Sequence, residues 1–311
     1  MYFLIFNFIF SFFGIALLIR YMQRRNQYQS IRNDVLATHI YTKKNKPTMA
    51  GIIVNIAFLL SCFWTNFDIY VKLTLALSLS FGLIGFIDDY IKVYKRNTDG
   101  FRGSVKLILE LLVTTFIIIY ADYKGLNFMK NGIKILDWEL NLGVFQSIFY
   151  IIMIVGSANA VNITDGLDGL VILPVILILL VFTFLTNDNN ILNLCYILIG
   201  GGIALFCFNK YPAKIFMGDV GSLFYGSILA FIAILIRQEF LYALLALIFI
   251  IEILSTTLQV FFHFFYGKRL LLAAPLHHHF EKKYWSEREI IFVFWSFFIL
   301  CLFLVLVLVY M

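Results

Sequence analysis

Two adjacent carboxylates, Asp88 and Asp89, close a long apolar stretch of the chain, and Lys92 follows them. On a continuing helix Lys92 lies four and three residues from the two acids, close enough for an ion pair. Adjacent carboxylates repel one another unless a cation shares them, and Mg²⁺ suits such oxygen ligands while leaving room for substrate phosphates. A hydrated helix end with an ordinary ion pair explains the same residues, so both interpretations stay open.

A second acidic group recurs every third residue in NITDGLDGL, at Asn162, Asp165 and Asp168. On a helix these side chains share a face, whereas Gly166 and Gly169 favour a turn. Glycine beside a carboxylate lets a nucleotide or phosphate approach the backbone closely. The alternative is a solvated turn between two apolar segments.

The segment PAKIFMGDVGSL places Asp219 beside Gly218, just before another apolar stretch. An acid there acts as a metal ligand or simply as a helix cap. Phe216, three residues earlier, could stack on a base. Asn209 ends the preceding apolar segment.

Three consecutive histidines, His277, His278 and His279, lie in APLHHHFEKKYW. Consecutive side chains cannot all face one metal, which argues against zinc. Imidazoles beside Lys282 and Lys283 predict a loop that binds phosphate and handles protons. A polar interfacial loop is the alternative.

The composition shows which elements must position these side chains. The chain has 311 residues, 62% of them hydrophobic and 14% charged, against about 45–50% and about 25% in soluble proteins. Its mean hydropathy is +0.91. A soluble globular protein of this length cannot hide that much apolar surface, and a disordered chain or fibrous repeat is also excluded. The apolar runs are long and uniform, which favours helices over a β-barrel. The sequence predicts an all-α, polytopic integral membrane protein.

At about 20 residues per span, the length accommodates about ten transmembrane helices in a single domain, residues 1–311. We expect a solvated loop at 121–144, with a turn at Lys124-Gly125. The predicted spans are 2–19, 48–65, 71–87, 106–120, 145–161, 170–186, 191–208, 222–236, 240–262 and 289–309.

The charges distinguish the two sides of this membrane protein. Ten spans place both termini on one side, and the loops on that side hold only five of the 24 Lys and Arg residues: Lys72, Lys124, Lys130, Lys134 and Arg237. Because cytoplasmic loops are rich in Lys and Arg, both termini face outward. The acidic clusters and the histidines all fall on the cytoplasmic side. Acids for a metal and cations for phosphates predict phosphoryl chemistry on a cytosolic substrate, with a lipid acceptor in the bilayer and no nucleic-acid partner.

At the motifs KPTMAG, GFIDDYIKV, NAVNITDGLDGL, FMGDVGSL and PLHHHFE the sequence resembles the phospho-N-acetylmuramoyl-pentapeptide-transferases. These belong to the polyprenyl-phosphate N-acetylhexosamine-1-phosphate transferase superfamily. The resemblance runs from about Lys43 to Glu281. Ala50 and Asn45-Lys46 depart from the family pattern in the first loop.

The resemblance implies a dimeric, Mg²⁺-dependent enzyme of the bacterial inner membrane, with ten helices and a cytoplasmic active site. Its reaction moves phospho-MurNAc-pentapeptide from UDP to undecaprenyl phosphate, giving lipid I and UMP. Whether transfer is direct or passes through an aspartyl phosphate is left open.

Residue roles follow from the same resemblance. Asp219 would bind Mg²⁺, with Asp88 and Asp89 as further candidate ligands that handle the reacting phosphates; Asp88 would be the base. Asn162, Asp165 and Asp168 would organise the nucleotide–metal site, and Phe216 would stack on uracil beside Asn209. Lys43 would contact the diphosphate, and Lys92 would screen the lipid phosphate. His277, His278 and His279 would contact the pentapeptide-sugar or phosphate end.

Two alternatives are weighed against this function. Another member of the superfamily would transfer GlcNAc-1-phosphate from UDP-GlcNAc, but PLHHHFE argues against it. An ion-coupled transporter would hold ionisable groups near the middle of the membrane, where only Glu110 and Glu252 are candidates.

Overall fold

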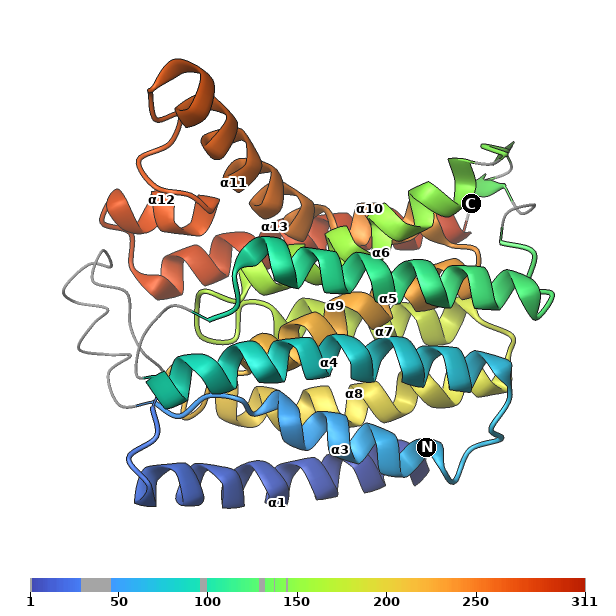
Figure 1. Cartoon of the computed structure of the whole chain (residues 1–311), viewed down its shortest axis with the longest axis horizontal. Helices are drawn as coiled ribbons and strands as arrows, with labels where there is room; N and C mark the ends of the chain where they lie inside the picture. Colours follow the sequence, from blue (N-terminus) through green and yellow to red (C-terminus); the bar gives the residue numbers. More distant parts are fainter. Residues whose placement is uncertain are drawn as a thin grey trace.

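The computed structural model describes residues 2–28, 46–95, 100–128, 132–136, 138–143 and 145–310. These residues form twelve helices and one two-stranded sheet (Figure 1). The helices are α1 (Tyr2–Arg24), α3 (Gly51–Cys62), α4 (Ile69–Lys95), α5 (Gly103–Tyr123), α6 (Phe145–Thr164), α7 (Ile172–Leu185), α8 (Asn189–Asn209), α9 (Asp219–Leu235), α10 (Glu239–Leu245), α11 (Leu247–Tyr266), α12 (Leu276–Lys282) and α13 (Glu287–Tyr310).

Seven of these helices, α1, α4, α5, α6, α8, α11 and α13, are long and apolar enough to cross a membrane. The helices α3, α7 and α9 are shorter but equally apolar. Each of the ten coincides with one predicted span. The prediction of an all-α, polytopic membrane protein is confirmed.

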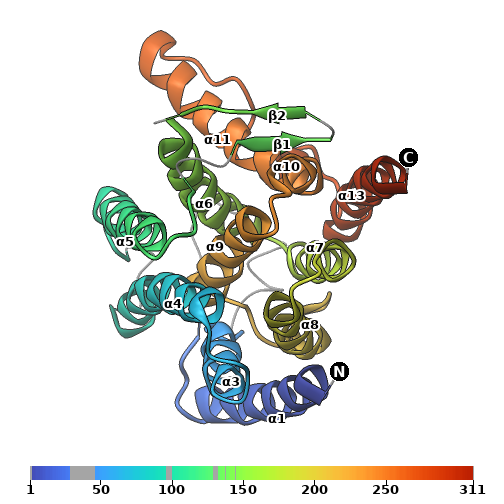
Figure 2. The ribbon, with the colours of Figure 1, turned by 90° about the vertical axis from the view of Figure 1, so that its right-hand side faces the viewer.

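The helix α9 forms the centre of the bundle. Every residue from Val220 to Ile234 is buried, and α4, α6, α3 and α7 pack around it. Figure 2 shows this arrangement end-on, with α9 enclosed by its neighbours. A helix that is apolar all round is stable only where other helices cover every face. The start of α9, where Asp219 lies, is therefore held firmly against its neighbours.

One span predicted as a continuous helix is broken in the structure. The segment 240–262 is not a single helix, because α10 and α11 meet at a break at Ala246. The break allows α10 to pack against α13 while α11 crosses α6 and leans away from the bundle (Figure 1). Uniform apolar sequence on both sides of Ala246 hides the break from hydropathy.

The loop predicted at 121–144 also needs correction. It contains a hairpin of β1 (Ile133–Ile135) and β2 (Trp138–Leu140), in which Ile133 pairs with Leu140. Three-residue strands are too short to give a periodic signal, and β1 is stabilised by packing against α10. The predicted turn at Lys124-Gly125 is present, and Gly125 adopts a φ of +88°, which favours glycine.

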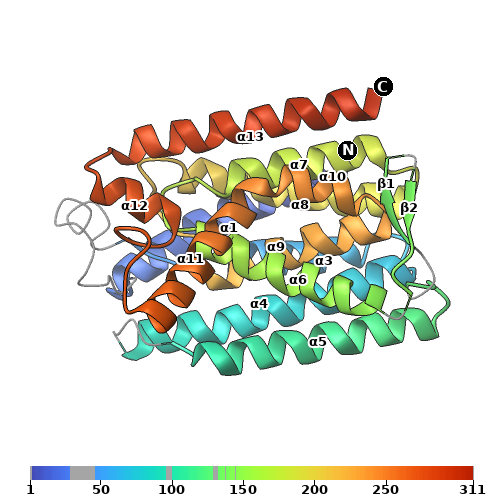
Figure 3. The same ribbon diagram turned by 90° about the horizontal axis from the view of Figure 1, so that it is seen from above.

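The two ends of the bundle differ. The start of α1, the end of α13 and the hairpin lie at one end, whereas α12 lies at the other (Figures 1 and 3). We call the end that carries α12 the site end. The last turns of α4 and the start of α9 also lie there, so the fold gathers the chemistry-bearing segments.

Candidate functional site

Three carboxylates from two helices meet at the site end. Asp88 and Asp89 come from the last turns of α4, and Asp219 is the first residue of α9. One oxygen from each lies within 4.8 Å of the others. Gly85, one turn earlier on α4, makes this approach possible, since a Cβ there would collide with the Asp219 carbonyl. We call these three residues the carboxylate cluster.

Two lysines neutralise part of this charge. The Lys92 Nζ lies 2.5 Å from Asp88 Oδ2 and 3.2 Å from Asp219 Oδ2. The Lys106 Nζ, from α5, lies 2.8 Å from Asp219 Oδ2. Nothing near Lys106 in the sequence signals this carboxylate partner. Three acids against two lysines leave the cluster with a formal charge of −1 when all five groups are ionised.

Backbone groups fix the orientation of the two α4 carboxylates. The Phe101 N–H donates to Asp88 Oδ1 at 2.5 Å, and the Val220 N–H donates to Asp89 Oδ2 at 3.1 Å. Gly218 adopts a φ of +77°, and a Cβ there would press on the Asp89 carboxylate. The glycine before Asp219 is thus required both by the backbone conformation and by the space beside Asp89.

The donor set fits a hard divalent cation such as Mg²⁺. All three ligating groups are carboxylates, with no sulfur or imidazole among the grouped residues, and hard cations prefer oxygen ligands. The remaining negative charge favours a cation over an anion at this point. The carboxylate cluster can therefore hold a metal, with Lys92 and Lys106 beside it.

A second group of residues forms around Asp168. Its Oδ2 accepts from the Lys46 Nζ at 2.9 Å and from the Ala213 N–H at 2.7 Å. Its own N–H donates to Glu287 Oε1 at 2.8 Å. Lys46 also lies 5.4 Å from the centre of the Phe216 ring. Lys46 therefore contacts both Asp168 and Phe216. Its position in a basic loop of the sequence does not predict this role.

Asn162 ties this region to α9, and Asn209 ties it to the loop before α9. The Asn209 side chain donates to the carbonyl of Ile215 at 3.1 Å, next to Phe216. The Asn162 side chain donates to the Ser222 Oγ at 2.8 Å, one turn after Asp219. Asp165 directly follows α6 and is half-buried. Lys43 lies outside the described residues.

The histidines lie on α12 and face three different partners. His277 is fully buried, with its N–H and its Nδ1 each 3.0 Å from a Glu252 carboxylate oxygen. His278 Nδ1 lies 2.6 Å from Glu281 Oε2. The Leu272 N–H donates to His279 Nδ1 at 3.1 Å. Three consecutive residues thus have three separate environments.

The surroundings of His279 favour the neutral form of its ring. Burial, together with the positive charge of Lys283, lowers the pKa of His279 from its ordinary value. Its Nδ1 accepts a backbone N–H, so the proton of the neutral ring resides on Nε2. The ring therefore offers a hydrogen bond donor, and it adds no positive charge for a phosphate.

Gly166 has a packing role that differs from the one expected. A Cβ on Gly166 would collide with the His277 ring. The space beside this glycine is filled by α12 and not by a ligand. Gly169 adopts a φ of +73°, and its Cβ would press on the Lys210 backbone. Both glycines let the 165–171 segment pack closely against its neighbours.

Comparison with known proteins assigns the family. Residues 71–237 match the family model of glycosyl transferase family 4. The chain is 40% identical to a phospho-N-acetylmuramoyl-pentapeptide-transferase of Desulfotalea psychrophila, over 90% of this chain and 84% of the relative. It is 38% identical to the protein of that name from Wolbachia pipientis wMel, over 95% and 94%. A third, from Thermodesulfovibrio yellowstonii, is 35% identical over 93% and 86%. These matches confirm the predicted resemblance, and the chain belongs to the phospho-N-acetylmuramoyl-pentapeptide-transferases of glycosyl transferase family 4.

Proposed function

We propose that this protein transfers phospho-MurNAc-pentapeptide from UDP-MurNAc-pentapeptide to undecaprenyl phosphate, giving lipid I and UMP. The family membership over most of the chain carries this proposal. The carboxylate cluster supports it, because it lies where an apolar bundle ends. A water-soluble donor and a membrane lipid can meet at such a place. The protein would act as a single domain, and as a homodimer in the bacterial inner membrane.

The reaction joins two anions, so the site must align them and screen their charge. A lipid phosphate oxygen forms a bond to the sugar-bearing phosphorus, and the bond from that phosphorus to UMP breaks. The Nζ atoms of Lys92 and Lys106 lie 2.5–3.2 Å from oxygens of Asp88 and Asp219, and there they can screen the charge of the incoming phosphate. Asp88 would accept the proton of the lipid phosphate.

The metal belongs to the carboxylate cluster. Asp219, with Asp88 and Asp89, would hold Mg²⁺, which when bound neutralises charge on the diphosphate and on the leaving UMP. The backbone donors of Phe101 and Val220 keep the α4 carboxylates oriented. The protein contributes a preformed arrangement that needs little rearrangement during the reaction.

The donor nucleotide would bind on the Asp168 side of the site. Asn162, Asp165 and Asp168 would organise the nucleotide and metal, and Phe216 would stack on uracil beside Asn209. Lys43 would contact the diphosphate. His278 and His279 would meet the sugar or phosphate end, whereas the buried His277 would hold α12 in place through Glu252.

UMP release from UDP-MurNAc-pentapeptide, measured on purified protein in detergent, tests this function. Release should require both polyprenyl phosphate and Mg²⁺. UDP-GlcNAc is tested as the competing donor. Faster turnover of UDP-GlcNAc than of UDP-MurNAc-pentapeptide would show that UDP-GlcNAc is the donor. Translocation of substrate across liposomes without UMP release would reject the transferase and favour a transporter.

Whether an aspartyl phosphate forms is tested with donor alone. Incubation with donor radiolabelled in the sugar phosphate, without the lipid, would leave label on the protein in a two-step route. Repeated absence of label supports direct attack.

A further inference from the structure

A cavity of about 400 Å³ lies at the site end between α8 and α13. Its apolar wall is made by Phe206, Ile291, Phe292 and Trp295. The Phe206 and Trp295 rings lie 6.1 Å apart. These side chains come from the last turn of α8 and the first turns of α13, two helices long and apolar enough to span a membrane. The cavity therefore suits hydrocarbon chains.

The other wall of the cavity is cationic. Lys210 directly follows the last residue of α8, and Arg288 is the second residue of α13; both line the cavity and are exposed. The Arg288 guanidinium lies 4.9 Å from the centre of the Tyr211 ring. Among the described residues no carboxylate lies within ion-pair distance of either cation. Asp168 also lines the cavity, but Lys46 neutralises it.

This combination points to a ligand with a phosphate above hydrocarbon chains. Trp295 donates its indole N–H to the Leu170 carbonyl at 3.1 Å, and tryptophan favours the border between hydrocarbon and headgroups. The two cations lie above this border. Each lysine or arginine near the surface attracts anionic lipid, and together they complement the charge of one phosphate.

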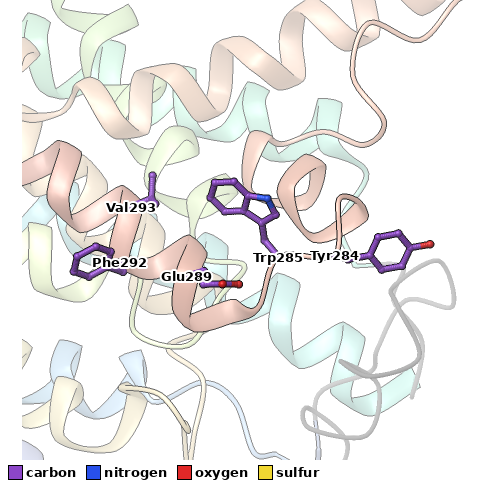
Figure 4. A pocket seen from close by; sticks show the side chains of 5 residues that line it. All are labelled: Tyr284, Trp285, Glu289, Phe292 and Val293. Carbon is purple, nitrogen blue, oxygen red and sulfur yellow. The ribbon is translucent and has the colours of Figure 1, made fainter.

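A neighbouring cavity of about 310 Å³ shows a contrasting lining (Figure 4). It shares Phe292 with the first cavity, but its charged residue is Glu289, whose carboxylate accepts from the N–H and hydroxyl of Ser286. An acid at this position repels a phosphate. The selective feature of the α8–α13 cavity is thus its pair of cations.

We propose that the α8–α13 cavity is a binding site for an anionic phospholipid of the surrounding bilayer. Its position argues against the lipid acceptor as occupant. The carboxylate cluster belongs to α4 and α9, whereas α13 lies across α9 from α4 and α5 (Figure 2). A phosphate that contacts Arg288 at the start of α13 is therefore kept apart from Asp88 on α4. The cavity adjoins the proposed nucleotide region, because Asp168 lines both, but the lipid site does not depend on the proposed reaction.

Trp295 provides a direct probe. The chain has four tryptophans, and replacing Trp64, Trp138 and Trp285 by Phe leaves Trp295 as a single fluorophore. This protein is reconstituted in phosphatidylcholine vesicles that contain a minor fraction of brominated phosphatidylglycerol or of brominated phosphatidylcholine. Bromine quenches only nearby indoles. Brominated phosphatidylglycerol should quench Trp295 at a clearly lower fraction.

Variants of the two cations complete the test. Lys210→Gln and Arg288→Gln should each raise the fraction needed for half-quenching about fivefold. Lys214→Gln is the matched control: Lys214 is exposed in the same loop but does not line the cavity, and its removal should change nothing. An equal effect of all three variants would mean that the preference for phosphatidylglycerol comes from general surface charge, and it would overturn the proposed binding site.

Other occupants give different results, each of which overturns the proposal. Equal quenching by both brominated lipids would mean that the headgroup is not recognised. Displacement of brominated phosphatidylglycerol by an equal fraction of polyprenyl phosphate would assign the cavity to the acceptor. Quenching by neither lipid would mean that no phospholipid occupies the cavity. UMP release plays no part in these measurements, so a failed transferase assay leaves their outcome interpretable.

Discussion

Asp219 lies where all the charges of the carboxylate cluster meet. It is the residue that contacts both Lys92 and Lys106, and it is the member of the cluster that opens the central helix. An asparagine there would keep the shape of the side chain but remove one charge from the proposed metal site. The charge and the fold can therefore be tested separately.

We predict that Asp219→Asn lowers UMP release at least about 100-fold at saturating Mg²⁺, because a metal ligand contributes several kcal/mol to stabilising charge in the transition state. UMP release by the purified variant measures this. Asp188→Asn is the control, since Asp188 caps α8 and its carboxylate accepts backbone N–H bonds that asparagine can also accept. Near-normal turnover of a well-folded Asp219→Asn protein would remove Asp219 from the metal site.

Lys46 joins the proposed nucleotide region and lies apart from the carboxylate cluster. Its contacts are the Asp168 carboxylate and the Phe216 ring. We predict that Lys46→Gln raises the KM for the UDP-sugar about tenfold and leaves kcat within about twofold, because a charge-assisted hydrogen bond contributes about 1.5–3 kcal/mol.

Steady-state kinetics at varied donor concentration checks this prediction. Lys46→Arg should recover part of the affinity because it keeps the charge. A large fall in kcat with an unchanged KM would place Lys46 in the chemical step and contradict the assignment.

The short helix α12 acts as a clamp on the 165–171 segment. His277 reaches Glu252 of α11 on one side and packs on Gly166 on the other. Glu287 at the start of α13 holds the Asp168 N–H. The helices α11, α12 and α13, all distant from Asp168 in the sequence, thus fix its position. This explains why a buried histidine lies within an otherwise polar motif.

Glycine substitutions test this clamp. We predict that Gly166→Ala lowers both UMP release and thermal stability, because its methyl group would displace the His277 ring at a cost of about 1–3 kcal/mol. Gly156→Ala on α6, the helix that precedes this segment, is the control, since a Cβ there meets nothing within 4 Å. Thermal unfolding in detergent and UMP release are measured on both. Equal behaviour of the two variants would show that α12 does not press on Gly166.

Hydropathy predicts the spans well because each consists of uniform apolar sequence. It does not predict the break at Ala246, where apolar residues continue on both sides, nor the hairpin, whose strands have three residues each. The acidic motifs were found because carboxylates are rare in apolar surroundings. Lys106 and Lys46 were missed as partners, because their carboxylates lie 113 and 122 residues away in the chain. Such pairings depend on tertiary packing.

The molecule as a whole is asymmetric along the bundle axis. The end of α4 and the start of α9, which carry the carboxylate cluster, lie with α12 at the site end, and the hairpin lies at the opposite end with the start of α1 (Figures 1 and 3). Basic residues are concentrated in the loops of the site end. If that end faces the cytoplasm, as the charge distribution predicts, a cytosolic nucleotide sugar reaches the carboxylates directly and both termini face outward.

Cysteine labelling in intact cells tests this orientation. In a variant whose four cysteines are replaced, a single cysteine is introduced at Lys283 on the site end or at Lys124 near the hairpin, both exposed. A membrane-impermeant maleimide should label the Lys124→Cys protein in cells with a permeabilised outer membrane. It should label the Lys283→Cys protein only after the inner membrane is opened. The reverse labelling pattern would mean that the membrane topology is inverted. The carboxylates would then lie on the side that cytosolic UDP-sugars do not reach, which would contradict both the orientation and the proposed function.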